Sequence, residues 1–189
     1  LDAKVRQGLR DWLRKLHDEI HLTSVLVTHD QEEALELADR IVVMNQGRIE
    51  QDGTPEHVFH QPANPFVMEF LGQVNVFQGR VRRGQALLGE MAIEYPNYEA
   101  DQEREAMVYM RPHELDIKRS RNGVASLAAR VVRVNPAGSV AKVNLRAGDG
   151  QNIYVDLPLE RLQELQLAHG DEVYVYPKNA RVFVPDYVI

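Results

Sequence analysis

Residues 25–49 read VLVTHDQEEALELADRIVVMNQGRI, and the order of features within them predicts an α/β arrangement. The apolar run over residues 24–27 is typical of a strand that is buried on both faces of a parallel sheet. Asp30 stands where a helix N-cap is expected, and Glu33, three residues on, completes the pattern of a capping box. This succession predicts a buried strand that leads directly into a helix.

A second strand and a hairpin are predicted next. Residues 41–44 are Ile-Val-Val-Met, another apolar run of the kind found in buried strands. Asn45-Gln46-Gly47 is expected to turn the chain, and residues 48–51 are expected to form the return strand.

Helices are predicted on both sides of these strands. Two short helices begin at Thr54-Pro55 and Asn64-Pro65, because proline favours the first helical position, and the second helix ends at Gly72. The first helix of the chain has Asp2 as its candidate N-cap. Its apolar residues recur at spacings of three and four and predict one apolar stripe, made of Val5, Leu9, Trp12, Leu13, Leu16 and Ile20.

The chain changes character near Gly72, where short strand-like runs between turn signals replace the helical patterns. Such a series predicts an all-β barrel or a pair of small barrels, with one short helix over residues 159–167. The strands are expected at residues 76–82, 85–88, 91–94, 107–110, 115–118, 128–135, 141–145, 153–157, 172–176 and 180–184.

Composition excludes several classes of protein. The formal net charge is −6, which gives the chain no electrostatic reason to hold a nucleic-acid backbone. Arg80, Arg82 and Arg83 form a small basic cluster that could bind an oligonucleotide on a barrel, but only Phe77 is near for stacking, so no nucleic acid is expected. The absence of cysteine excludes disulfides, thiolate nucleophiles and cysteine zinc sites.

His29 is the candidate catalytic residue. It lies at the predicted C-terminal end of a parallel strand, where open α/β sheets place their ligands. An imidazole there can donate to a terminal phosphate and orient an attacking water, which is the positioning that phosphoryl transfer needs. The alternative interpretation is a strand-end histidine whose ring is satisfied by the backbone.

Other histidines carry weaker hypotheses. His57 and His60 are three residues apart beside Glu56, and this spacing on a helix would allow a metal site. The alternative, which we prefer, is a pair of surface histidines near a turn, so no metal is expected. His17 and His21 are interpreted as part of a solvated helix end.

The segment that opens this section resembles the switch region, or H-loop, of the nucleotide-binding subunits of ABC transporters. There, Thr-His-Asp precedes Gln-Glu-Glu-Ala and a strand that ends in a glycine hairpin. The resemblance implies that His29 is the switch histidine, which contacts the γ-phosphate of ATP. It also implies that Asp2 corresponds to the D-loop aspartate at the ATP-sandwich interface, a role compatible with helix capping.

The remainder is similar to the sugar- and anion-importer branch of that family, in which a transport-associated OB-like β region follows the ATPase. Residues 110–114, MRPHE, resemble an Arg-Pro-Glu signature of that region, with His113 inserted. Residues 72–79, GQVNVFQG, are similar to sulfate/thiosulfate importer ATPases, with sugar, phosphate and polyamine importers as alternatives. The implied fold is an α/β fragment over residues 1–72, the C-terminal part of a P-loop ABC ATPase sheet with helices, then an all-β OB-like barrel region over residues 73–189.

The sequence lacks other parts of that family's machinery. It contains no G-x-x-x-x-G-K-[ST] loop, no L-S-G-G-Q-like signature and no apolar strand that ends in Asp-Glu. The resemblance places these parts before Leu1, so we expect the chain to be a piece of a longer subunit, inactive and without a cofactor by itself. For the longer subunit it implies ATP and Mg²⁺, a homodimer, membrane permease partners, and a cytoplasmic location on the inner face of the cell membrane.

A rival interpretation has no enzyme. The β-rich half could be a small-ligand-binding or dimerising regulatory module. In either case, the strands expected at residues 24–27 and 41–44 would expose backbone and apolar faces without the neighbours of a larger sheet, which predicts an oligomer.

Overall fold

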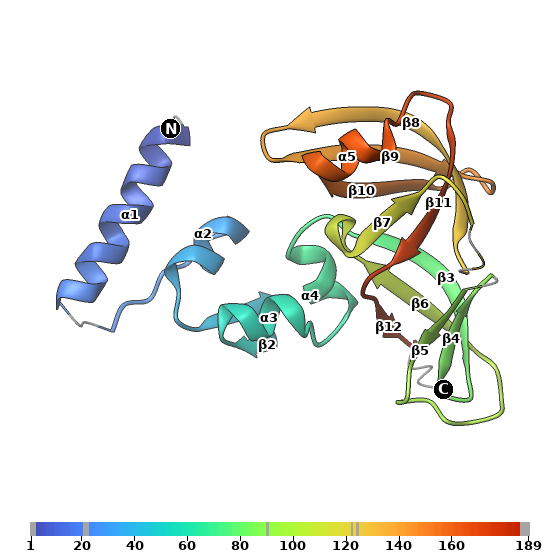
Figure 1. Ribbon diagram of the computed structural model, residues 1–189. Coiled ribbons are helices and arrows are strands. Elements are labelled where there is room, and N and C mark those ends of the chain that lie inside the picture. Colours follow the sequence, from blue (N-terminus) through green and yellow to red (C-terminus); the bar gives the residue numbers. More distant parts are fainter. Residues whose placement is uncertain (1–2, 21–22, 90, 122, 124, 186–189) are drawn as a thin grey trace. The chain divides into compact units, whose positions relative to one another are not determined.

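The computed structural model describes residues 3–20, 23–89, 91–121, 123 and 125–185, and it divides the chain into two compact units (Figure 1). The first unit is Leu1–Gly72 and the second is Gln73–Ile189. Helices and one β-hairpin make up the described part of the first unit, whereas strands dominate the second. No helix in these described ranges is long and apolar enough to cross a membrane.

The helices of the first unit begin where the sequence predicts. Asp30, Thr54 and Asn64 each accept a hydrogen bond at the side-chain oxygen from the backbone N–H three residues on, which confirms them as N-caps. The helices are α1 (Ala3–Ile20), α2 (Gln31–Leu37), α3 (Pro55–His60) and α4 (Pro65–Phe70).

The strands of the first unit differ from the prediction. β1 (Ile41–Asn45) pairs antiparallel with β2 (Arg48–Gly53) in a two-stranded sheet, so the hairpin is confirmed but the parallel sheet is wrong for the described residues. Residues 24–27 form no strand, and the side chains of Val25 and Val27 are 90% and 92% exposed. The physical reason is that a strand needs a hydrogen-bonded neighbour, and no described segment pairs with these residues.

A small core supports the hairpin. Ile41 and Val43 of β1 pack with Val58 of α3 and Val67 of α4, whereas the alternate residue Val42 points to solvent. Antiparallel strands with one covered face show this alternation, so β1 is half-buried rather than buried on both faces.

The apolar stripe predicted for α1 is only partly covered in this structure, with Leu13 and Leu16 half-buried. Val5, Leu9 and Trp12 are exposed, whereas Arg10 is buried and contacts α2. Arg10 and Arg14 both donate hydrogen bonds to Glu36 of α2, so the side of α1 that carries these two arginines faces α2.

The second unit consists of two five-stranded sheets in which every paired strand is antiparallel. The β3 sheet has the order β12-β6-β3-β4-β5 and the β9 sheet has the order β10-β9-β8-β11-β7. The β3 sheet contains β3 (Asn75–Arg82), β4 (Gln85–Leu88), β5 (Met91–Glu94), β6 (Arg104–Met110) and β12 (Arg181–Phe183). The β9 sheet contains β7 (Leu115–Lys118), β8 (Leu127–Ala137), β9 (Val140–Ala147), β10 (Asn152–Pro158) and β11 (Glu172–Pro177).

Each strand predicted after Gly72 is present, with ends that shift by up to three residues. β6 begins at Arg104 rather than at residue 107, and β8 reaches Ala137 rather than residue 135. The two short helical elements are η1 (Pro112–Glu114) and α5 (Leu159–Leu165), of which α5 was expected. Turn signals and the alternation of apolar residues therefore predict this unit well.

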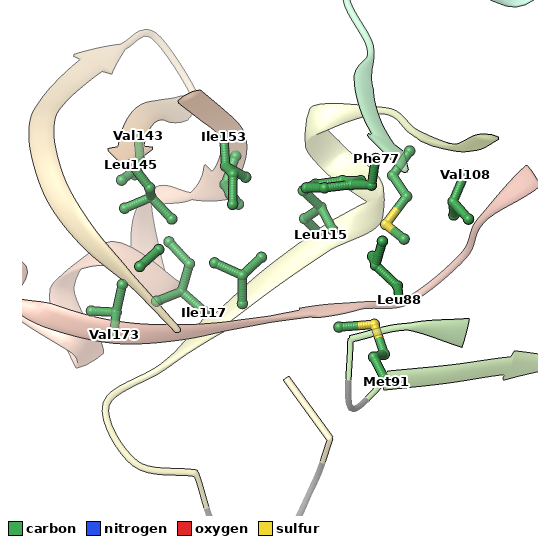
Figure 2. Packing of buried hydrophobic residues seen from close by; sticks show 14 of the residues in the cluster. Phe77, Leu88, Met91, Val108, Leu115, Ile117, Val143, Leu145, Ile153 and Val173 are labelled. Carbon is green, nitrogen blue, oxygen red and sulfur yellow. The ribbon is translucent and has the colours of Figure 1, made fainter. Parts of the chain in front are cut away.

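One cluster of buried apolar side chains is shared by the two sheets (Figure 2). It includes Phe77 and Val108 of the β3 sheet together with Val143, Leu145 and Ile153 of the β9 sheet. Fully burying one such side chain stabilises a fold by about 1.5–3 kcal/mol, so this shared cluster holds the two sheets together.

Candidate functional site

His29 lies in the loop that precedes α2, and its side chain is exposed. The backbone on its C-terminal side is fixed by Asp30, whose N–H donates to Thr28 Oγ1 at 3.0 Å. Asp30 Oδ1 accepts from the N–H of Glu33 at 3.1 Å. The loop is thus tied to the first turn of α2 while the imidazole faces solvent, where it can reach a ligand.

Arg10 of α1 braces this loop. Its guanidinium donates to Asp30 Oδ2 at 3.3 Å and to Glu36 Oε2 at 3.1 Å, and the residue is 8% exposed. Arg14, one turn further, donates to the backbone carbonyl of Glu36 at 2.9 Å. Arg10 was not among the predicted site residues, because it lies outside the motif that contains His29 and meets Asp30 and Glu36 only in the folded chain.

The loop that Asp30 and Arg10 hold in place presents one imidazole, that of His29, to solvent. An exposed imidazole can accept or donate a hydrogen bond to a phosphoryl oxygen, but by itself it supplies neither a phosphate cradle nor a metal. Asp2, the second predicted site residue, lies outside the described residues. Of the two predicted site residues, the structure therefore describes only His29.

His57 and His60, the pair with the spacing of a possible metal site, contact their neighbours in the chain. The ring of His60 makes an edge contact with Phe59 at a centroid distance of 5.2 Å, and the ring of His57 lies against Gly53. Across the described ranges, no three His, Cys, Asp or Glu side chains are grouped in a way that could hold a metal ion. His57 and His60 are surface residues of α3.

The basic cluster at the C-terminal end of β3 is partly neutralised by two carboxylates. Arg80 and Arg82 lie 3.1 Å and 3.9 Å from the carboxylate of Glu103, and Arg83 pairs with Asp101. These pairs are exposed and each contributes little to stability. They do, however, reduce the positive potential that a nucleic-acid backbone would need.

The MRPHE segment forms a buried charged network in the second unit. Glu114 is buried, and its Oε2 accepts from the N–H of Arg111 at 2.8 Å, while its Oε1 accepts from the guanidinium of Arg181. Its backbone carbonyl accepts from the N–H of Lys178 at 2.7 Å. Glu114 therefore ties η1 to the segment between β11 and β12.

Two arginines face this one carboxylate. Burial lowers the pKa of Arg111, an effect that the charge of Glu114 opposes and the charge of Arg181 reinforces. Because a buried carboxylate is stable only when it is paired and hydrogen-bonded, the segment is a structural anchor in this chain.

Two family models match the second unit. The one described as CysA C-terminal regulatory domain matches residues 75–117, and the one described as TOBE-like domain matches residues 121–178. The first match contains the whole MRPHE segment, and the second contains β8–β11. The TOBE-like match confirms the predicted transport-associated OB-like region, for which a five-stranded antiparallel sheet is a typical architecture.

Curated relatives extend the similarity through both units. A sulfate/thiosulfate import ATP-binding protein CysA of Nitrosomonas europaea is 53% identical over 186 residues, which is 97% of this chain and 51% of that protein. The protein of the same name from Bacillus cereus is 50% identical over 191 residues, which is 100% of this chain and 54% of that protein. The chain therefore spans about half the length of the curated relatives that it matches.

A solved structure of the cytoplasmic molybdate-binding protein ModG, with molybdate bound, aligns with 59% of this chain and 96% of that chain. The TM-score is 0.48 and the sequence identity is 20%.

Proposed function

This chain is a homologue of the sulfate/thiosulfate import ATP-binding proteins over nearly its whole length, and we propose that it is the C-terminal part of the ATP-hydrolysing subunit of an importer for inorganic anions. The observation that carries the proposal is an identity near 50% that extends from the His29 segment through the TOBE-like region. Sulfate and thiosulfate are the favoured solutes, with sugars, phosphate and polyamines as the alternatives.

His29 acts, in this proposal, as the switch histidine that contacts the γ-phosphate of ATP. The support is its exposed imidazole on a loop held by Asp30 and braced by Arg10. Positioning of this kind is most of what a protein contributes to phosphoryl transfer. Asp2 acts as the D-loop aspartate, a role that rests on its place in the sequence alone.

The remaining parts of the reaction belong to the longer subunit. ATP and Mg²⁺ would be held by a phosphate-binding loop of the G-x-x-x-x-G-K-[ST] type, which residues 1–189 do not contain. Two such subunits would enclose ATP between them and drive membrane permease subunits from the cytoplasmic side. The second unit would serve as the regulatory region, in keeping with the description of the family that matches residues 75–117.

Exposed apolar side chains in the first unit support a larger assembly. Val25 and Val27 are almost fully exposed, and Met44 and Ile49 on the hairpin are exposed as well. Apolar surface of this kind is normally covered in a folded protein. The ATP-binding half of the longer subunit would cover it by adding strands beside residues 24–27.

A calorimetric titration tests the part of the proposal that concerns this chain alone. We expect no saturable heat when MgATP is added to the purified chain, because a nest of backbone N–H groups and a lysine for the phosphates are absent from the sequence. Tight, magnesium-dependent binding would contradict the proposal.

A chimera tests the role of His29. The corresponding half of the Nitrosomonas europaea protein is replaced by this chain, and ATP hydrolysis and anion uptake are measured with its permease. We expect His29→Ala to abolish hydrolysis, and the matched control His60→Ala, another exposed histidine of the first unit, to retain it. Hydrolysis that survives His29→Ala would refute the proposed role.

A further inference from the structure

The β3 sheet ends at β5 with an edge that no described strand covers. The Tyr95 N–H donates to the Gly84 carbonyl at 2.7 Å, which fixes the phase of the ladder between β4 and β5. Hydrogen-bonded and non-hydrogen-bonded pairs alternate in such a ladder, so Ala92 and Glu94 turn their N–H and C=O groups away from β4. Among the residues that the structure describes, none donates or accepts a hydrogen bond at these outward groups.

The edges of the other sheet are covered by side chains. At β10, the amide of Asn75 bonds to both the N–H and the carbonyl of Tyr154. At β7, the guanidinium of Arg161 donates to the Ile117 carbonyl at 3.0 Å. The edge at β5 has no such cover and its outward groups face water, which leaves it open to an additional strand.

A cavity of about 470 Å³ lies at the C-terminal end of this edge. Glu94 of β5 is opposite Gln85 of β4, and both side chains are exposed on the outer face of the sheet. Met91 of the same strand points the other way, into the shared apolar cluster (Figure 2). The lining consists of Arg83, Gly84, Gln85, Glu94, Pro96 and Glu99.

Backbone hydrogen bonds hold the walls of this cavity. The segment after β5 folds back over the turn between β3 and β4, where the Gly84 N–H donates to the Tyr98 carbonyl at 2.7 Å. Beside it, the Arg83 N–H donates to the Ala100 carbonyl at 3.0 Å. The cavity is therefore formed before a ligand arrives, and little ordering of the loop opposes binding.

The charge at the cavity is negative. Arg83, the cation of the lining, already pairs with Asp101. Glu94 and Glu99 are exposed, and neither forms an ion pair within the described part of the chain. Two carboxylates are thus left without a counterion beside an open sheet edge.

We propose that the β5 edge and this cavity together bind an extended basic segment of a partner protein. The segment adds a strand beside β5 and places a lysine or arginine between Glu94 and Glu99. A residue opposite Glu94 in such a ladder has its Cβ about 4.5–5.5 Å away, within reach of a long cationic side chain. Backbone hydrogen bonds supply affinity in this mode of recognition, and the pocket selects the side chain.

Other occupants fit less well. Residues 91–103 contain no lysine, arginine or histidine, so the same edge of a second copy would bring no cation to the two carboxylates. A nucleic acid would be repelled, because its phosphates need positive charge. The proposal concerns a protein partner of the second unit and does not depend on ATP hydrolysis.

Fluorescence anisotropy on the full chain tests the proposal with labelled peptides of alternating lysine and valine (KVKVKV) and of alternating arginine and threonine (RTRTRT). We expect saturable binding of these peptides and none of the acidic peptide EVEVEV. Glu94→Gln and Glu99→Gln should each weaken binding by at least about tenfold, because each removes a charge-assisted hydrogen bond. Glu160→Gln, at an exposed carboxylate of α5, is the matched control and should leave the affinity unchanged.

Two further measurements test the strand pairing itself. Ala92→Pro removes an N–H that points away from β4, a change that a sheet edge tolerates, and it should abolish binding. A KVKVKV peptide that is N-methylated at every residue keeps its charge but cannot donate backbone hydrogen bonds, so it should not bind either. Circular dichroism checks the fold of each variant, and the methylated peptide decides the question if Ala92→Pro does not fold.

Four results would overturn the proposal. The first is an absence of saturable binding for both basic peptides. The second is equal affinity for the methylated and unmethylated peptides, which would indicate attraction by charge without an added strand. The third is a loss of affinity in Glu160→Gln equal to that in Glu94→Gln. The fourth is a dimer of the chain, seen by light scattering, that dissociates in Ala92→Pro, since this would assign the edge to a second copy.

Discussion

The side-chain amide of Asn75 in β3 forms two hydrogen bonds with the backbone of Tyr154 in β10, 79 residues further along the chain. Asn75 Nδ2 donates to the Tyr154 carbonyl at 2.8 Å, and the Tyr154 N–H donates to Asn75 Oδ1 at 2.8 Å. Because β10 is the edge of the β9 sheet, the amide satisfies backbone groups that no strand covers there. One buried side chain thus joins the two sheets of the second unit.

Removal of this amide should destabilise the second unit. Asn75 is 2% exposed and also donates to the Met110 carbonyl at 3.3 Å, so Asn75→Ala leaves buried backbone groups without partners. We expect a loss of about 2–4 kcal/mol in the free energy of unfolding. Urea unfolding followed by tyrosine signals measures it, since all seven tyrosines come after residue 94. Gln78→Ala, an exposed amide on the same strand, is the control and should change stability by less than about 0.5 kcal/mol.

The Asn75 contact illustrates what a sequence alone does not reveal. The strands of the second unit could be predicted because alternation and turns are local: in β9 the buried Ala141, Val143 and Leu145 alternate with polar residues. The partner of Asn75, in contrast, is set by how two sheets meet, and nothing near residue 75 encodes it. A pattern within one strand fixes which side chains face inward but not which distant backbone they meet.

In the first unit, too, local patterns predict the ends of helices but not which segments pair with one another. The N-cap of α2 follows from Asp30 and three neighbouring residues, and the structure agrees. A buried strand at residues 24–27 was predicted from apolarity, which reports what a segment would bury but not whether a neighbour is present. Site prediction is limited likewise: the motif marks His29 as a candidate, whereas Arg10, which braces its loop, is 19 residues away in the chain.

Gly79 in β3 has no room for a side chain. A Cβ at this position would lie 2.8 Å from the backbone carbonyl oxygen of Leu87, which belongs to the neighbouring strand β4. Gly79→Ala must therefore push two paired strands apart, and we expect a loss of about 1–3 kcal/mol. Gly148→Ala, where nothing lies within 4 Å, is the matched control and should leave the urea midpoint unchanged. Equal midpoints for Gly79→Ala and the parent chain would contradict the close approach.

Glu114 should be far more sensitive than an exposed carboxylate. Glu114→Ala leaves the buried Arg111 and the partly buried Arg181 without this carboxylate between them, and breaking a buried pair in this way costs about 3–5 kcal/mol. Glu103→Ala, which removes an exposed partner of Arg80, should cost less than about 1 kcal/mol. Thermal unfolding of both variants makes the comparison. A small loss for Glu114→Ala that matches Glu103→Ala would show that water reaches the network.

Asp116 should make the second unit sensitive to acid. Burial raises the pKa of its carboxyl group, but the Ile117 N–H, the Tyr176 hydroxyl and the charge of Arg161 lower it more, so the folded pKa lies below the ordinary 3.8. A pKa depressed by folding contributes stability above the unfolded value, and that stability is lost as the pH falls through the folded pKa. Urea unfolding from pH 7 to pH 3 should therefore show decreasing stability below about pH 4.

Two variants separate Asp116 from the other carboxylates of the chain. Asp116→Asn cannot titrate, so its loss of stability between pH 5 and pH 3 should be smaller than that of the parent chain. Tyr176→Phe removes one donor, at 2.9 Å from Asp116 Oδ2, and should give an intermediate pH dependence. An Asp116→Asn variant that loses as much stability in acid as the parent chain would assign the effect to other groups, such as Asp171, whose pKa the Ala168 N–H lowers.

Arg10 should control the order of the His29 loop and not the stability of the whole chain. Arg10→Met keeps most of the aliphatic stem but removes the hydrogen bonds to Asp30 and Glu36. Both carboxylates are partly exposed and can be hydrated after the change, so the penalty should be local. We expect the backbone amides of residues 28–37 to exchange hydrogen faster, on the order of tenfold, while the strands of the second unit keep their protection. Exchange in Arg10→Lys should be faster than in the parent chain and slower than in Arg10→Met, because an ammonium cannot reproduce the fork of two donors.

Lys15→Met, at an exposed position of the same helix, is the control. If exchange in Arg10→Met is no faster than in this control, Asp30 holds the loop without help from α1.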